Sequence, residues 1–128
     1  RVDLEHRGMQ WRGRTLGARA DSLAYHLFQR VMLEQQWAEG TTEGQYVGDV
    51  QDAARSPEAR VAVYERRGGH VAAIVSRTAD AVPVSRRGAG SLPDLFIAYS
   101  ADRGIIVTGY QVSSIETVSI PKEARWLK

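Results

Sequence analysis

The chain has 128 residues, of which 43% are hydrophobic and 25% charged, and its formal net charge at pH 7 is +2. This length fits one domain, and the composition is that of an ordinary folded protein rather than a disordered or fibrous one. The absence of cysteine excludes a disulfide framework, a thiolate nucleophile and a cysteine-ligated zinc site, and no apolar run approaches the roughly 20 residues of a membrane-spanning helix.

Residues 1–20 are rich in Arg and Gly and show no clear hydrophobic period. They are predicted to form a linker or a partly ordered arm, and residues 21–128 a single domain. Because the chain begins at Arg1 and carries no apolar signal segment, we expect it to be part of a longer polypeptide.

The first predicted helix carries two candidate functional residues. Asp21 is a suitable N-cap, and Gly40 follows the expected end of the helix near Glu39. His26 and Arg30 lie one turn apart, on a different side from the apolar stripe. Both side chains can therefore address one phosphate group.

A second helix is predicted to begin near Thr42, because Thr42 and Gln45 have the spacing of a capping box. Its apolar residues, Tyr46 and Val50 among them, recur at helical spacing. The helix is expected to end at Ser56, since a proline follows.

An antiparallel sheet is predicted after these helices, where the hydrophobic period becomes that of a strand. Gly68-Gly69 is the expected turn of the first hairpin, and residues 78–93 are expected to form a basic surface loop. The expected strands cover residues 61–67, 70–77, 94–100, 105–112 and, as a shorter fifth strand, 113–120. The predicted fold class is α+β, with two N-terminal helices packed on a four- to five-stranded antiparallel sheet.

The strand over residues 105–112 carries two further candidates. Because side chains alternate along a strand, Ile106, Thr108, Tyr110 and Val112 are expected on one face. This puts a hydroxyl and a phenol side by side. Both residue types are also common in strands for packing reasons, and a His–Arg pair is common on a solvated helix face, so spacing alone does not identify an enzyme.

Several kinds of catalytic site are excluded by their missing motifs. The histidines, at positions 6, 26 and 70, form no HExxH motif, and no carboxylates are paired at ligand spacing, so we expect no metal. The glycines form neither a P-loop nor a GxGxxG motif, so we expect no nucleotide cofactor. A serine hydrolase would need a GxSxG elbow, which is missing. General acid–base chemistry and binding remain.

Metal-free cleavage of RNA needs a general base, cations, hydroxyl donors and a proton donor. A histidine, which titrates near neutral pH, can take the proton of a ribose 2′-OH. Cations and hydroxyl donors stabilise the charge on the phosphorane, and a proton donor releases the 5′-oxygen. His26, Arg30, Thr108 and Tyr110 are of these types.

Arginine supplies nearly all the positive charge, with fifteen Arg against two Lys. Arg presents a planar fork that suits phosphate, so Arg66 and Arg67, together with His70 beside the same predicted turn, are candidate substrate-binding residues. A GC-rich genome also gives an excess of Arg, and charges at a strand edge also prevent aggregation.

Four stretches within residues 22–112 follow one another as SLAYHLFQRVMLEQQW, TTEGQYVGDVQDAARSP, VAVYERRGGHVAAIVSR and LFIAYSADRGIIVTGY. The first contains HxxxR, and the last ends in Ile-Ile-Val-Thr-x-Tyr after a basic turn. In these motifs and their order the chain resembles small toxin ribonucleases of the barnase–EndoU–colicin–RelE superfamily.

The resemblance implies a metal-independent endoribonuclease toxin domain that needs no cofactor. Such a domain cleaves RNA by internal transphosphorylation and leaves a 2′,3′-cyclic phosphate and a 5′-hydroxyl. The resemblance makes His26 the acid–base residue and Arg30 a phosphate ligand. It makes Thr108 and Tyr110 contacts of the scissile phosphate or of its leaving group.

The resemblance also implies partners and a place of action. The domain would be secreted or delivered as an effector that acts in the cytoplasm of a target cell. Its partners would be an RNA substrate, with tRNA, rRNA and mRNA all open, and a cognate immunity protein. That inhibitor would be acidic, because it would cover the Arg-rich face.

Two departures from the family leave the identity of the base open between His26 and His70. Several branches use a catalytic Lys, whereas no Lys precedes Lys122 here. The RNase A-like branch has its His further before its Arg, at a position where this chain has Arg19. The alternative function is a non-catalytic protein-interaction module, or an Arg-rich nucleic-acid-binding module, of the same fold.

Overall fold

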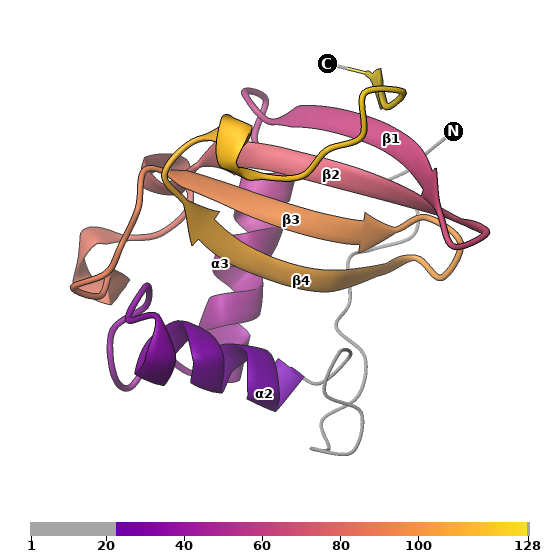
Figure 1. Ribbon diagram of the computed structural model, residues 1–128. Helices are drawn as coiled ribbons and strands as arrows, with labels where there is room; N and C mark the ends of the chain where they lie inside the picture. Colours follow the sequence, from indigo (N-terminus) through magenta and orange to yellow (C-terminus); the bar gives the residue numbers. More distant parts are fainter. Residues whose placement is uncertain (1–22, 128) are drawn as a thin grey trace.

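The computed structural model describes residues 23–127, which form an antiparallel sheet with helices behind it and beside one edge (Figure 1). The fold class is α+β, and the helices precede the sheet in the chain, as predicted. None of the helices in this described part is long and apolar enough to cross a membrane. The predicted arm over residues 1–20 and the predicted N-cap Asp21 lie outside the described residues.

The first helical segment is shorter than predicted. α2 covers Leu23–Phe28 and continues as a π-helical turn, η2, over Gln29–Leu33. The chain then leaves the helix at Gln35, whose φ is 55°, rather than near Glu39. The reason is tertiary, because Gly88 packs against the backbone carbonyl of Gln35 so closely that any Cβ at position 88 would collide with it.

The helix α3 covers Glu43–Arg55 and begins as predicted. The Gln45 N–H donates to the Thr42 hydroxyl at 3.1 Å, and the Thr42 N–H donates to the Gln45 side chain at 3.0 Å. This capping box satisfies two backbone donors that the helix itself leaves without partners. The helix ends before Ser56, which confirms the predicted boundary.

The strands form one antiparallel sheet in the order β4-β3-β2-β1-β5. They are β1 (Arg60–Arg66), β2 (Gly69–Arg77), β3 (Asp94–Ser100), β4 (Ile105–Val112) and β5 (Arg125–Trp126). The bounds of β3 and β4 are those predicted. The first hairpin is displaced by one residue, because Arg66 pairs with Gly69. Its turn is therefore Arg67-Gly68, both with positive φ, as a type I′ turn requires.

The prediction of a strand over residues 113–120 is wrong. This segment contains a short 3-10 turn, η5 (Ile115–Thr117), and crosses the front of the sheet in Figure 1. Its apolar side chains, including Val118 and Ile120, pack on the sheet face, so the segment covers the sheet instead of pairing with it. The fifth strand is β5, which pairs with β1.

The sheet has a different apolar cluster on each face. The main core lies between α3 and the sheet and contains Tyr46, Val50, Ile74 and Ile97. A smaller cluster around Phe96 lies on the outer face, opposite α3, beneath the crossing segment. α2 lies beside the β4 edge (Figure 1). The edge strand β4 is thus the element that both helices can reach.

The strand β4 contains a bulge. Ala98 pairs with Thr108 and Tyr99 pairs with Ile106, so Val107 is an extra residue in the ladder. Ile106 consequently belongs to the main core, while Thr108 belongs to the outer face. The prediction that these two residues share a face is wrong, because a strict period of two fails across a bulge.

The predicted basic loop over residues 78–93 is not a free basic surface. It contains two 3-10 turns, η3 (Thr78–Asp80) and η4 (Val84–Arg86). Arg86 donates from Nε to Asp49 Oδ2 at 3.0 Å and from NH2 to Oδ1 at 2.5 Å. The hydrogen bond to Asp49 raises the pKa of the Arg86 guanidinium. The charge of Arg86 thereby compensates the charge of the Asp49 carboxylate, a residue that is only 2% exposed.

Candidate active site

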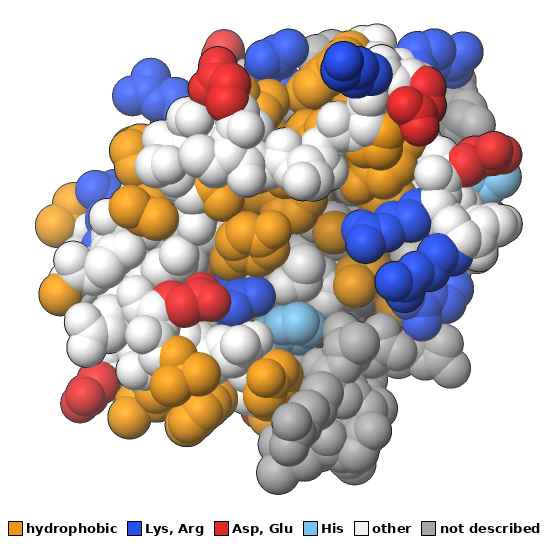
Figure 2. Space-filling view, viewed as in Figure 1, with side chains coloured by type: hydrophobic (Ala, Val, Ile, Leu, Met, Phe, Trp, Pro, Cys, Tyr) orange, Lys and Arg blue, Asp and Glu red, His pale blue; other side chains and the backbone are white. Residues whose placement is uncertain are grey.

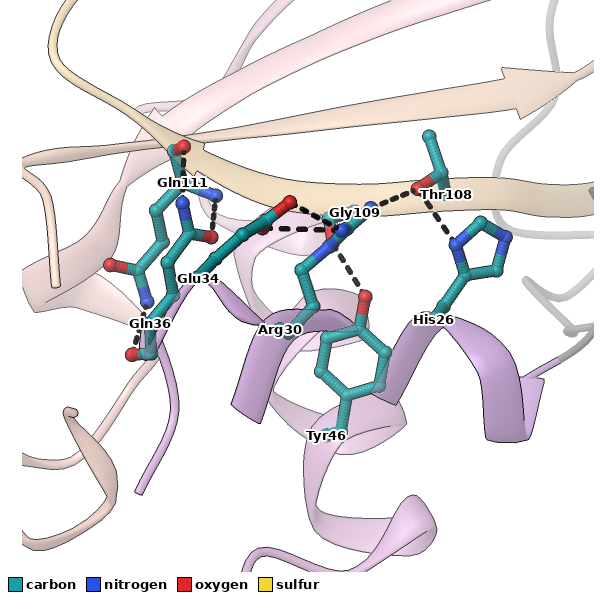
Figure 3. A network of polar contacts seen from close by, with 8 residues as sticks. All are labelled: His26, Arg30, Glu34, Gln36, Tyr46, Thr108, Gly109 and Gln111. Atoms are coloured by element: carbon teal, nitrogen blue, oxygen red, sulfur yellow. Dashed lines mark hydrogen bonds and ion pairs between the residues drawn. The ribbon is translucent and has the colours of Figure 1, made fainter. Parts of the chain in front are cut away.

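Four side chains singled out in the sequence meet at the β4 edge of the sheet. His26 and Arg30 come from α2 and η2, and both approach Thr108 of β4 (Figure 3). The Thr108 Oγ1 lies 3.4 Å from His26 Nδ1, and Arg30 NH2 donates to the same oxygen at 3.0 Å. The Arg30 guanidinium also lies over the Tyr110 ring, 5.1 Å from its centroid. The fold therefore assembles a histidine, a guanidinium, a hydroxyl and a phenol in one place.

All three nitrogens of the Arg30 guanidinium donate hydrogen bonds to other residues. Its Nε donates to the Gly109 carbonyl at 2.9 Å. Its NH1 donates to both carboxylate oxygens of Glu34, at 3.2 and 3.0 Å. Arg30 is only 5% exposed, and a buried cation needs such a partner. The resulting orientation points NH2 at the Thr108 hydroxyl.

The outer edge of β4 is closed by side chains rather than by another strand. The Gly109 carbonyl accepts a second hydrogen bond, from the Tyr46 hydroxyl at 2.5 Å. Gln36 donates to the Gln111 carbonyl at 2.9 Å and accepts from the Gln111 N–H at 2.6 Å (Figure 3). Buried backbone groups need such partners, and an open edge invites pairing with another chain. The same bonds hold both helices against the strand that carries Thr108.

A glycine in β4 permits close packing of α3 at this point. A Cβ on Gly109 would lie 3.0 and 3.1 Å from the two methyl carbons of Val50, which is too close for an unstrained contact. The small residue therefore sets the distance between α3 and the strand. Tyr46, one turn before Val50 on α3, can then reach the Gly109 carbonyl.

Thr108 and Tyr110 line a cleft of about 430 Å³ on the outer face of the sheet. Three arginines, Arg66, Arg67 and Arg103, line the same cleft. They come from the β1–β2 and β3–β4 turns, which lie at one end of the sheet, and Figure 2 shows basic side chains gathered there. The two arginines predicted to bind substrate thus share a cleft with the two predicted hydroxyl groups.

The electrostatics of the site keep the Tyr110 phenol protonated near neutral pH. Partial burial raises the pKa of Tyr110, the Arg30 charge acts in the opposite direction, and the Glu34 charge raises it further. Partial burial likewise raises the pKa of Tyr64 in the same cleft, with Arg66 opposing the rise. Both phenols are therefore hydrogen-bond donors at neutral pH.

His26 and Arg30 lie behind the cleft wall rather than on it. His26 is 7% exposed, and the lining of the cleft includes Thr108 and Tyr110 but neither of these two side chains. Arg30, predicted as a phosphate ligand, is therefore joined to the cleft through Thr108 and Tyr110. In this structure its contacts orient those residues.

His70 lies apart from this group. Its Nδ1 is 3.0 Å from Asp102 Oδ1 and its Nε2 is 3.5 Å from Glu65 Oε1, while its backbone N–H donates to Asp102 Oδ2 at 2.6 Å. It lines a different hollow, which Glu65, Glu123 and Arg125 also line. Carboxylates on both sides make this an unfavourable place for a phosphate. His70 instead ties the first hairpin to the β3–β4 turn.

Several residues of the site were not predicted from the sequence. Glu34 could have been found, because it lies four residues after Arg30 on the helical segment. Tyr46 and Tyr64 carry no such signal, since only the packing of α3 and the sheet brings them to the site. Arg103 stands out in the sequence only as one of many arginines.

No family model, curated protein or solved structure matches the chain. Within residues 23–127, no group of three or more His, Asp and Glu side chains is placed to hold a metal ion.

Proposed function

We propose that the protein is a metal-independent endoribonuclease, a toxin domain of the barnase–EndoU–colicin–RelE kind. The observation that carries the proposal is the contact of His26 with Thr108, a residue that lines a cleft together with three arginines and Tyr110. A general base, hydroxyl donors and a basic cleft are the parts that RNA transphosphorylation needs without a metal.

The first step is the removal of a proton from the ribose 2′-OH. His26 lies behind the cleft wall, so the proton reaches it through the Thr108 hydroxyl. Thr108 Oγ1 takes the proton of the 2′-OH as its own proton passes to His26 Nδ1, which is the acceptor when the imidazole carries its proton on Nε2. Thr108 Oγ1 also accepts from Arg30, whose positive charge favours the negative charge that develops beside it. The 2′-oxygen then attacks phosphorus, and a P–O2′ bond forms.

The second step is the departure of the 5′-oxygen. The P–O5′ bond breaks, and the leaving oxygen takes the proton of the Tyr110 phenol, which returns to its neutral form by taking the proton that His26 accepted. The products are a 2′,3′-cyclic phosphate and a 5′-hydroxyl. Arg30 acts here as a positioning residue and as a positive charge behind Thr108, which favours the negative phosphorane.

The proposal extends to the biological setting that the family resemblance implies. The substrate is RNA, the domain acts as a delivered effector in the cytoplasm of a target cell, and the producing cell holds an inhibitor. The exposed arginines of the cleft support an acidic inhibitor, because opposite charges speed and orient association.

A second candidate function is binding of single-stranded nucleic acid without catalysis. The specific observation in its favour is the burial of His26 and Arg30, at 7% and 5% exposure. In that function the two side chains serve to hold α2 against β4.

One experiment separates the two candidates. Purified protein is incubated with total bacterial RNA in EDTA, beside a His26→Ala variant and a His70→Ala control, and the RNA is resolved on a denaturing gel. The proposal expects discrete fragments from the wild type and the control, ending in 2′,3′-cyclic phosphate, and none from His26→Ala. Cutting by His26→Ala would move the base elsewhere, and cutting only with Mg²⁺ would refute the mechanism. If the wild type does not cut RNA, the second candidate, binding of single-stranded nucleic acid without catalysis, would be favoured.

A further inference from the structure

We propose that the cleft on the outer face of the sheet binds one unpaired nucleotide next to the reacting phosphate. Its base would stack on the aromatic floor of the cleft, and its outer phosphate would lie on the arginine rim. The inference deepens the proposed ribonuclease function and rests on it for the position of the reacting phosphate at Thr108. Its consequence is that the protein selects single-stranded over double-stranded nucleic acid.

The arginines of the cleft lie at one of its ends. Arg66, Arg67 and Arg103 are exposed and lie at the turn end of the sheet, and the cleft lining contains no acidic side chain. Thr108 and Tyr110 lie on β4, further from that end. A strand that lies in the cleft thus has hydroxyl donors for one phosphate and guanidinium groups for the next.

The floor between these two ends is aromatic and apolar. Tyr64 and Phe96 line it, and Tyr110 packs against Phe96 with ring centroids 5.3 Å apart. Tyr64 is half-buried, so one side of its ring is supported by the sheet. Aromatic side chains within a basic groove are the usual means of binding unpaired bases.

The size of the cleft excludes a duplex. Its volume of about 430 Å³ lies at the small end of the range of roughly 300–1,000 Å³ for sites that enclose small molecules. Val118 and Ser119 of the crossing segment form one wall. A base that is paired and stacked within a helix cannot enter a site of this size without leaving its partner.

The test measures binding separately from cleavage. A short fluorescent DNA strand of mixed sequence is used, because it lacks the 2′-OH and cannot undergo transphosphorylation. Its affinity is measured by anisotropy in EDTA, as a single strand and annealed to its complement. We expect the single strand to bind about five- to 150-fold more tightly, which is the range of one base–aromatic stacking contact.

Variants of Tyr64 test the floor. Tyr64→Phe keeps the ring and is expected to bind as the wild type does. Tyr64→Leu keeps apolar bulk but removes the ring, and is expected to lose most of the preference for the single strand. Circular dichroism of both variants checks that they fold. A Tyr64→Leu protein that folds and keeps the full preference would overturn the proposal.

A charge-matched pair of double variants tests the rim. Arg66→Gln with Arg103→Gln is expected to reduce the slope of log affinity against log salt by about 0.7, the value for the one phosphate that the rim contacts on a single strand. Arg55→Gln with Arg77→Gln removes two exposed arginines outside the cleft and should leave the slope unchanged. Equal effects of the two pairs, or equal affinity for duplex and single strand, would refute the proposal. Selective binding by a protein that does not cut RNA would refute the ribonuclease function but not the cleft assignment.

Discussion

The guanidinium of Arg30 and the carbonyl of Gly109 are 79 residues apart in the chain and are joined by a hydrogen bond of 2.9 Å. The bond lies at the edge of the sheet, where β4 has no neighbouring strand among residues 23–127. It therefore serves the fold and the site together. It closes the edge of β4, and it fixes the group that donates to Thr108.

The hydroxyl of Thr108 can be removed with little change in shape. In Thr108→Val the NH2 of Arg30 loses its acceptor and Nδ1 of His26 loses its contact. We expect the free energy of unfolding to fall by about 1–3 kcal/mol and single-turnover RNA cleavage in EDTA to fall at least about 100-fold. Thr108→Ser retains the hydroxyl and should stay within about tenfold of the wild type. A wild-type rate in Thr108→Val would remove this residue from the mechanism.

The contact between Gly109 and Val50 predicts a large difference between two glycine substitutions. Gly109→Ala brings a methyl group to 3.0 Å from Val50 and should destabilise the protein by about 1–3 kcal/mol. Gly48→Ala adds the same methyl group to the interior of α3, where nothing lies within 4 Å, and should stabilise it by about 0.5–1 kcal/mol. Urea unfolding measures both. Adding Val50→Ala to Gly109→Ala should show favourable coupling, and strict additivity would contradict the steric explanation.

The carboxylate of Asp49 accepts from Trp37 Nε1 at 3.1 Å and from Arg86. Asp49→Ala leaves both donors without this partner, and we expect a loss of about 3 kcal/mol, the lower end for a broken buried pair, because water reaches Arg86. Asp52→Ala removes an exposed carboxylate of the same helix that acts on Arg86 through its charge and should change stability by less than about 1 kcal/mol. Thermal unfolding of the two variants side by side measures the difference. Equal effects would show that the Asp49 cluster contributes no more than a surface charge.

Burial raises the pKa of the Tyr46 phenol strongly, and the nearby Arg30 charge and hydrogen bond oppose the rise only in part. The folded state thus keeps this proton at a pH where the unfolded chain has lost it. The stability that the neutral phenol contributes is complete below pH of about 10, the ordinary tyrosine value, and is lost as the pH rises above it. Unfolding in urea from pH 8 to 11 should show this decline in the wild type and a weaker decline in Tyr46→Phe. Parallel declines would exclude Tyr46 as the source.

The helices and strands whose signals lie in residues adjacent in the sequence could be predicted from the sequence alone. The capping box at Thr42 and the proline after Ser56 set the two ends of α3, and alternation with flanking turn residues set β3 and β4. The HxxxR spacing likewise put His26 and Arg30 on one side of a helical segment. Each of these signals lies within the segment that it describes, so the structure of that segment can be predicted without knowing how it packs on the rest of the chain.

The sequence by itself determined the fold class, the order of its elements and the four side chains that meet at the β4 edge. The tertiary structure alone decided how they meet, because each deciding contact joins residues far apart in the chain. Gly88 against Gln35 ends the first helical segment early, and the unpaired Val107 turns Thr108 toward the outer face. The same long-range packing places His70 among carboxylates, away from the cleft that Thr108 and Tyr110 share with the arginines.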